Sequence, residues 1–251
     1  MIKKLFIILL LTSFTTGYAQ DIQQYFDQGN QLYQQGNFDQ ALEVYDRILE
    51  KGFESGELYF NIGNSYYRLG KIGKARLAYE RAQKFLKGDE ALEQNQKLVQ
   101  ARLVDQIENP PRLFLTAWWE ALLNLFNISL LTILVSVLFW LSLIIGGLRL
   151  YYRSRGRHGG LKGIFAVVLT VFMVFSFILI NKIYIFETEK YGIILDASVT
   201  LYAEPSDTGT ELFVVHEGAK VRIERQNQMW FEVKLADGKT GWLQRENFEI
   251  I

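Results

Sequence analysis

The sequence predicts a multi-domain membrane protein with three successive parts: an all-α repeat solenoid, a two-helix transmembrane hairpin and a small all-β barrel. Three observations lead to this order. The first third of the chain repeats itself at a fixed offset, the middle holds two long apolar runs, and the last third alternates β-branched and polar residues between turn signals. Such a change of composition along one chain indicates a soluble domain, a membrane region and a second soluble domain.

The composition excludes several classes of function. The chain carries 27 basic and 27 acidic side chains, so no net charge favours nucleic acid or an acidic substrate. It has no cysteine, which excludes disulfides, thiol nucleophiles, cysteine-based metal sites and a lipidated cysteine anchor. The two histidines, His158 and His216, are predicted to lie on opposite sides of the membrane. We therefore expect no enzyme activity, no cofactor, no metal and no nucleic-acid partner.

Residues 1–19 have the pattern of a signal peptide. Lys3 and Lys4 precede a short apolar run, and the Gly17-Tyr18-Ala19 segment has the small-x-small pattern of a cleavage site. The alternative is an uncleaved anchor, but the apolar run is short for a membrane span. Export of the N-terminal domain is the prediction.

Two apolar runs, residues 129–148 and 163–185, are predicted to be transmembrane helices. At about 1.5 Å per residue the first reaches roughly 30 Å, the thickness of the hydrocarbon layer. The loop between them, residues 149–162, is basic and has no acidic residue. Short basic loops stay cytoplasmic, although a solvated or lipid-bound loop without topological meaning is the alternative. The basic residues of the loop are Arg149, Arg153, Arg155, Arg157 and Lys162.

This hairpin predicts an inner-membrane protein whose N- and C-terminal domains both lie on the periplasmic side, in agreement with the signal peptide. Residues 110–128 are predicted to form an interfacial helix that leads into the first span. Pro110 and Pro111 end the preceding helix, and Trp118 and Trp119 are residues that favour the membrane–water interface.

The N-terminal segment repeats with a period of 34 residues, which maps Gly29 to Gly63 and Tyr45 to Tyr79. The glycines allow close approach of paired helices, and small alanines stand where the second helix of each unit crosses the first. This pattern resembles the tetratricopeptide repeat, although Phe53 stands where that family often has proline. The predicted boundaries are 20–109 for the whole domain, 22–55 and 56–88 for the two repeats, and 89–107 for a capping helix.

The concave face of such a stack is lined by the first helix of each unit and binds extended peptides or helices. An asparagine amide can hold a peptide backbone, and Arg68 can pair with a carboxylate. The resemblance does not extend to capture of a C-terminal carboxylate, since Phe26 and Phe60 replace the family's clamp lysines. The alternative is that these side chains only solvate or fold the stack. The predicted partner-binding residues are Phe26, Asn30, Tyr33, Phe60, Asn64, Tyr67 and Arg68.

The last segment, residues 190–251, has five to seven short predicted strands. Its similarity to bacterial SH3 domains rests on Leu201-Tyr202, His216-Glu217-Gly218, Trp230 and Gly241-Trp242-Leu243. That resemblance implies an SH3-like barrel that recognises peptides or cell-wall material through aromatic side chains. The predicted contacts are Tyr202, Trp230 and Trp242, and the alternative is that the tryptophans are packing residues.

The whole order of parts, with the linker Glu108 to Pro111, resembles the tetratricopeptide-plus-SH3 member of the Bacteroides aerotolerance (Bat) family. The resemblance implies a membrane-associated complex with other Bat-family membrane proteins, linked to oxygen or stress tolerance, with membrane lipid and cell-wall peptide as further partners. Two functions stay open. One is a non-enzymatic scaffold or adaptor, and the other is an envelope sensor whose SH3-like domain binds a ligand and signals across the membrane.

Overall fold

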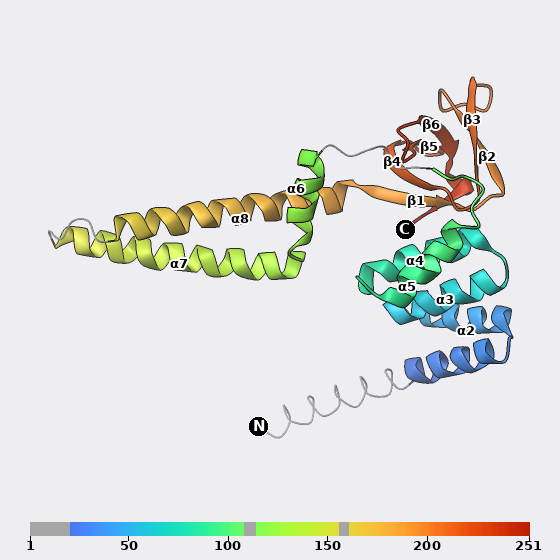
Figure 1. Ribbon diagram of the computed structural model, residues 1–251, viewed down its shortest axis with the longest axis horizontal. Helices are drawn as coiled ribbons and strands as arrows, with labels where there is room; N and C mark the ends of the chain where they lie inside the picture. Colours follow the sequence, from blue (N-terminus) through green and yellow to red (C-terminus); the bar gives the residue numbers. More distant parts are fainter. Residues whose placement is uncertain (1–20, 108–113, 156–160) are drawn as a thin grey trace. The chain divides into compact units, whose positions relative to one another are not determined.

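The structure is a computed structural model that describes residues 21–107, 114–155 and 161–251 (Figure 1). It divides into two compact units. The first unit joins the N-terminal helices to the C-terminal sheet, and the second runs from Pro110 to Lys190. The apolar helices are thus inserted between two halves of one unit. The predicted signal peptide, the Glu108–Pro111 linker and the loop residues 156–160 lie outside the described residues.

The helical half begins with a helix over residues 21–34. Gly36 and Gly70 end the first helix of each pair with φ of 81° and 75°, a conformation that residues with a Cβ rarely adopt. Ser55 and Asp89 each cap the helix that follows them. Each side chain accepts a hydrogen bond from the backbone N–H group three residues later. The remaining helices are α2 (Phe38–Glu50), α3 (Gly56–Arg68), α4 (Ile72–Phe85) and α5 (Glu90–Gln100).

Two tyrosines hold the pairs together. A Cβ placed on Gly29 would lie 2.3 Å from Cε1 of Tyr45, and one on Gly63 would lie 2.4 Å from Cε1 of Tyr79. The rings therefore occupy the space that glycine leaves open between the paired helices. Both tyrosines belong to one continuous core that extends from α2 to Leu103, beyond the end of α5. This packing explains why glycine and tyrosine recur at the same offset.

The second unit consists of α6 (Phe114–Asn124), α7 (Ile128–Ser154) and α8 (Lys162–Thr188). Each of the two long helices has 27 residues and is long and apolar enough to cross a membrane. Both extend beyond the predicted apolar runs, because α7 continues through Arg149 and Arg153 and α8 continues to Thr188. Asn127 caps α7 by accepting a hydrogen bond from the backbone N–H of Leu130.

The C-terminal half is a seven-stranded sheet with the order β3-β2-β6-β5-β4-β1-β7. The pairings are antiparallel, and the register of β5 with β6 places Glu232 opposite Trp242. The outermost strands, β3 and β7, are not neighbours in this order, so the sheet is open where the sequence predicts a closed barrel. The strands are β1 (Lys190–Ile194), β2 (Ser198–Tyr202), β3 (Glu211–His216), β4 (Lys220–Gln226), β5 (Trp230–Lys234), β6 (Thr240–Gln244) and β7 (Phe248–Ile250).

Alternate residues of these strands form the core of the sheet. Leu201, Val221, Val233 and Leu243 are fully buried, whereas their neighbours along each strand are partly or fully exposed. This period of two is the pattern that predicted strands in the sequence. Ile107, from the chain that follows the repeats, also packs against this core.

Candidate functional site

The two predicted groove asparagines lie in matching hydrogen-bond networks. The Asn30 carboxamide oxygen accepts from the Tyr45 hydroxyl and from the Asn61 amide, both at 2.8 Å. The Asn64 oxygen accepts from the Tyr79 hydroxyl at 2.7 Å and from the Asn95 amide at 2.8 Å. Each asparagine therefore joins the second helix of its own pair to the first helix of the next. Its oxygen is occupied by the fold, which leaves the amide N–H groups as its contribution to a ligand.

Asn95 reveals a partial third repeat that the sequence analysis missed. It donates to Asn64 as Asn61 donates to Asn30, and the offset of 34 residues maps Asn61 to Asn95. The same offset maps the cap Ser55 to Asp89 and Leu58 to Leu92. Helix α5, predicted as a capping helix, therefore lies in the register of a first repeat helix. The signal in the sequence was the offset of 34 residues from Ser55 to Asp89 and from Asn61 to Asn95.

Four of the predicted groove residues meet in a small cavity of about 120 Å³. They are Tyr33, Asn64, Tyr67 and Arg68. The structure adds three residues to them, one of which, Leu98, is 52% exposed on α5. The added residues are Tyr79, Asn95 and Leu98.

The other three predicted groove residues do not line this cavity. Phe26 and Phe60 pack with their rings 6.3 and 6.0 Å from those of Tyr45 and Tyr79. Asn30 lies in the network one repeat earlier. The two phenylalanines therefore contribute to the folding of the stack, and the cavity takes its lining from all three units, from Tyr33 to Leu98.

One arginine lines this cavity, and a second stacks on the ring of a lining residue. The Arg68 guanidinium lies 4.7 Å from the centre of the Phe38 ring, and that of Arg102 lies 4.4 Å from the centre of the Tyr67 ring. Such stacking leaves the guanidinium N–H groups available in the ring plane. Among the described residues, the Arg68 side chain stacks on the Phe38 ring and takes part in no hydrogen bond or ion pair. The site therefore offers amide and guanidinium donors to an acceptor-rich ligand.

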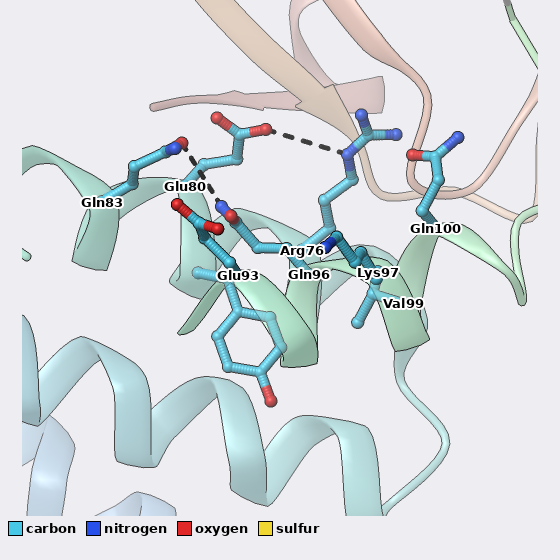
Figure 2. Close-up of a pocket in the computed structure, with 9 residues that line it drawn as sticks. Arg76, Glu80, Gln83, Glu93, Gln96, Lys97, Val99 and Gln100 are labelled. Atoms are coloured by element: carbon cyan, nitrogen blue, oxygen red, sulfur yellow. Dashed lines mark hydrogen bonds and ion pairs between the residues drawn. The ribbon is translucent and has the colours of Figure 1, made fainter. Parts of the chain in front are cut away.

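A second cavity of about 380 Å³ lies between α4 and α5 (Figure 2). Buried Tyr79 and Val99 contribute to its lining, together with polar side chains from both helices. Gln96 donates to Gln83 at 3.3 Å across the two helices. The sequence does not predict this cavity, because its polar residues have no periodic signature. Its polar lining is Arg76, Glu80, Gln83, Glu93, Gln96, Lys97 and Gln100.

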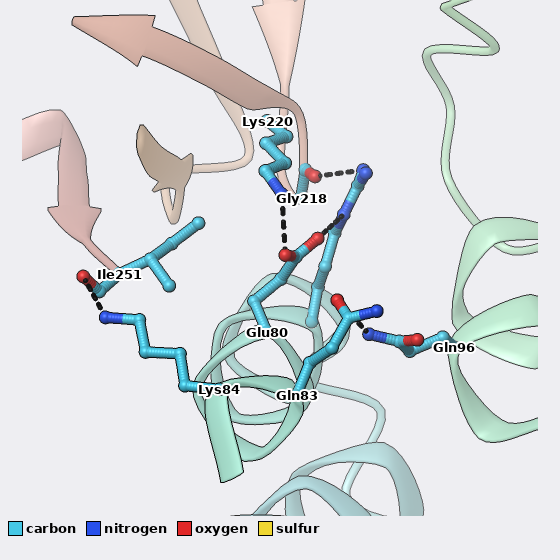
Figure 3. Close-up of polar contacts among 8 residues, drawn as sticks. Glu80, Gln83, Lys84, Gln96, Gly218, Lys220 and Ile251 are labelled. Atoms are coloured by element: carbon cyan, nitrogen blue, oxygen red, sulfur yellow. Dashed lines mark hydrogen bonds and ion pairs between the residues drawn. The ribbon is translucent and has the colours of Figure 1, made fainter. Parts of the chain in front are cut away.

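Two residues that line this second cavity, Arg76 and Glu80, also contact the C-terminal half of the chain (Figure 3). The Arg76 guanidinium donates to the Gly218 carbonyl oxygen at 2.7 Å, and Lys220 pairs with Glu80 at 2.6 Å. Burial lowers the pKa of the Arg76 guanidinium, and the Glu80 carboxylate opposes this change. Lys84 donates to the Ile251 carbonyl oxygen at 3.0 Å. Successive residues along one side of α4 thus hold the loop before β4 and the C-terminal end of the chain.

A second set of contacts joins the chain after α5 to the same loop. The Asp105 carboxylate accepts from the backbone N–H of His216 at 2.6 Å, and its other oxygen lies 3.0 Å from the His216 ring nitrogen Nδ1. His216 thus has a structural partner. The described residues contain no group of three or more side chains suited to hold a metal ion.

The predicted aromatic contacts of the sheet lie together but differ in exposure. The Tyr202 ring meets the Trp230 ring edge-on at 5.9 Å, and Tyr202 is paired with Trp242 across β2 and β6. Trp230 is only 8% exposed, so it packs within the sheet. Tyr202 and Trp242 are half-buried, and the Arg225 guanidinium lies 5.8 Å from the Trp242 ring.

Comparison with known proteins gives one family match. The pattern of the tetratricopeptide repeat family matches residues 26–91. No curated protein matches the chain. Solved structures that resemble it include an NlpC/P60 family protein from Bacillus cereus ATCC 10987, with 18% identity over 26% of this chain and 21% of the other, and a TM-score of 0.22. The chain spans about a fifth of that protein, and a likeness this slight carries no argument about function. Residues 26–91 are thus a helical repeat of the kind that serves as a protein-interaction scaffold and is typically non-catalytic.

Proposed function

We propose that the protein is a non-enzymatic, membrane-anchored scaffold that binds a protein partner through the smaller of the two cavities of its repeat domain. The observation that carries this proposal is the convergence of Tyr33, Asn64, Tyr67 and Arg68 on one cavity. Four residues chosen from the sequence for partner binding come from two helices and lie together.

The chemistry of the cavity suits an extended peptide segment with an acidic side chain. Asn64 is held by two donors to its oxygen, so its amide N–H groups are free to donate to a backbone carbonyl. Arg68 adds guanidinium donors for a carboxylate. Exposed Leu98 supplies an apolar contact beside them. A segment of another envelope protein is the partner we propose.

The contacts within the first unit support a membrane hairpin with both flanking domains on one side. Lys220 pairs with Glu80, although the whole apolar insertion separates them in sequence. Groups in contact must share one compartment, and two crossings by α7 and α8 return the chain to the side from which it left. The basic residues at the α7 end favour a cytoplasmic turn, which places both domains in the periplasm.

The open sheet belongs to this proposal as an SH3-like domain that closes the end of the repeat stack. Its loop before β4 binds α4, the second helix of the last complete pair. A stack of so few units needs its terminal apolar face covered. Membership of a Bat-type complex linked to aerotolerance is part of the same proposal, and it rests on the resemblance of the sequence.

The test is recovery of partner proteins from membranes with Arg68→Gln. We expect the affinity for the partner, and with it recovery, to fall by about one to two orders of magnitude, because loss of a hydrogen bond to a charged group costs about 1.5–3 kcal/mol. The matched control is Arg47→Gln, which removes the same charge from an exposed position on α2. Equal recovery with both variants, at unchanged thermal stability, would remove the cavity from the interaction.

A further inference from the structure

Helix α6 has two apolar faces. One packs on the long helices, where the Trp119 ring lies 6.1 Å from that of Phe177 and the Leu123 side chain is buried. The other is exposed, with Phe114 81%, Trp118 58% and, just after the helix, Leu125 70% accessible. A step of four residues places Phe114 and Trp118 on one side of the helix, and Leu125 follows its last residue. A helix that is apolar on opposite sides is suited to a core or a membrane rather than to water.

The surroundings of this exposed face are apolar. In Figure 1, α6 crosses the end of the pair formed by α7 and α8, where α7 begins and α8 ends, instead of continuing along α7. The outer faces of α7 and α8 expose large apolar side chains along their length, among them Ile133, Val137 and Tyr184. Helix α6 packs on these two helices through Trp119 and Leu123. Tryptophan is enriched where a bilayer meets water.

Lys182 fixes α6 in this position. Its ammonium donates to the carbonyl oxygen of Leu123 at 2.5 Å and to that of Phe126. The last carbonyls of a helix lack intrahelical partners and carry partial negative charge. At the edge of a bilayer, where water is scarce, the lysine and the carbonyls satisfy each other. A cation inside the predicted second span thus has a structural reason, and it holds the turn between α6 and α7.

We propose that α6 is an in-plane membrane helix. It embeds its face of Phe114, Trp118 and Leu125 in the boundary between headgroups and acyl chains, and Lys182 sets its level. The occupant of this face is lipid, because α6 packs across the end of two helices whose outer faces expose large apolar side chains along their length. This inference rests on the membrane hairpin of the proposed function. It adds to the interfacial helix predicted from the sequence the face that enters the bilayer and the Lys182 contacts that hold the helix at one level.

Depth measurements on spin-labelled protein test the proposal. The chain has no cysteine, so single cysteines at Phe114, Trp118 and Leu125 label one site each. The full-length protein is reconstituted in phosphatidylethanolamine–phosphatidylglycerol vesicles, and collisions with oxygen and with a water-soluble nickel chelate report depth. We expect all three labels to lie at one shallow level. An upright helix would separate Phe114 from Leu125 by about 16 Å along the membrane normal.

Two further variants complete the test. A label at Val137, exposed in the middle of α7, should lie deep. With Lys182→Met the Trp118 label should become more mobile and more accessible to nickel, whereas Lys182→Arg should restore the shallow level. A deep Val137 label with three water-exposed or strongly staggered α6 labels overturns the in-plane helix alone. A water-exposed Val137 label overturns the hairpin itself. Labels shielded from both reagents would mean that a second copy covers the face, which overturns the assignment to lipid.

Discussion

The Glu217 carboxylate accepts a hydrogen bond from the backbone N–H of Gly73, with 2.7 Å between Oε1 and N. Gly73 lies in the first turn of α4, where N–H groups have no partner within the helix and negative charge is favoured. The residue at the cap position, Lys71, makes no side-chain cap. A side chain of the sheet therefore caps a repeat helix from 144 residues away.

Removal of this cap should destabilise the repeats. We expect Glu217→Ala to lower the free energy of unfolding of the first unit by about 1 kcal/mol, the usual value of a helix cap. Thermal melting followed by the helical circular dichroism signal measures the change in detergent-solubilised protein. The control is Glu246→Ala, which removes an exposed carboxylate from the same domain. Equal melting of the two variants would show that the contact is not energetically significant.

Asn95 should contribute to stability as a repeat position. Replacement by alanine removes its hydrogen bond to Asn64, and a loss of about 1 kcal/mol is expected. Asn61→Ala, at the matching position one unit earlier, should cost a similar amount. Exposed Gln94→Ala is the control. If Asn95→Ala and Gln94→Ala had the same free energy of unfolding in urea, the contact between Asn95 and Asn64 would not stabilise the stack, and α5 would act only as a capping helix.

The repeat tyrosines should make the fold sensitive to alkali. Burial raises the pKa of Tyr79 well above the ordinary value, as it does for Tyr45. Above a pH of about 10 the unfolded chain loses the tyrosine proton while the folded chain keeps it. The unfolded state then binds fewer protons, so the free energy of unfolding falls as pH rises. Urea unfolding at several pH values measures this decrease. Above a pH of about 10 the free energy of unfolding should fall less steeply with pH for Tyr79→Phe than for the unchanged protein. Equal slopes would contradict a raised pKa of Tyr79.

Much of the helical half could be predicted because its residues recur. Gly29 with Tyr45 and Gly63 with Tyr79 form the same contact twice, and a contact that repeats leaves a periodic trace in the sequence. The third unit was missed because α5 keeps only the cap, Leu92 and Asn95, without the glycine, alanine and tyrosine that defined the first two units. Tyr33, Asn64, Tyr67 and Arg68, which the sequence suggested as partner contacts, line one cavity. Helix periodicity explains why Asn64, Tyr67 and Arg68 share one side of α3, and their role in binding stays a prediction.

The contact between the repeats and the sheet could not be predicted from the sequence. The contacts of Gly73 with Glu217 and of Glu80 with Lys220 occur once each between distant segments, so neither leaves a pattern. Open and closed sheets also share the same alternation of buried and exposed residues, which is why a barrel was expected. Trp230 was proposed as a ligand contact, and its burial favours the alternative of packing within the sheet.

The central claim is that a membrane hairpin holds the repeats and the sheet on one side of the membrane, and the accessibility of single cysteines tests it most directly. Gln34, Ser154 and Asn227 are exposed and lie in the repeats, at the end of α7 and in the sheet. In cells with a permeable outer membrane, an impermeant thiol reagent should label cysteines at Gln34 and Asn227. The cysteine at Ser154 should react only after lysis. Labelling of Ser154 in unlysed cells, or opposite behaviour of Gln34 and Asn227, would contradict the hairpin.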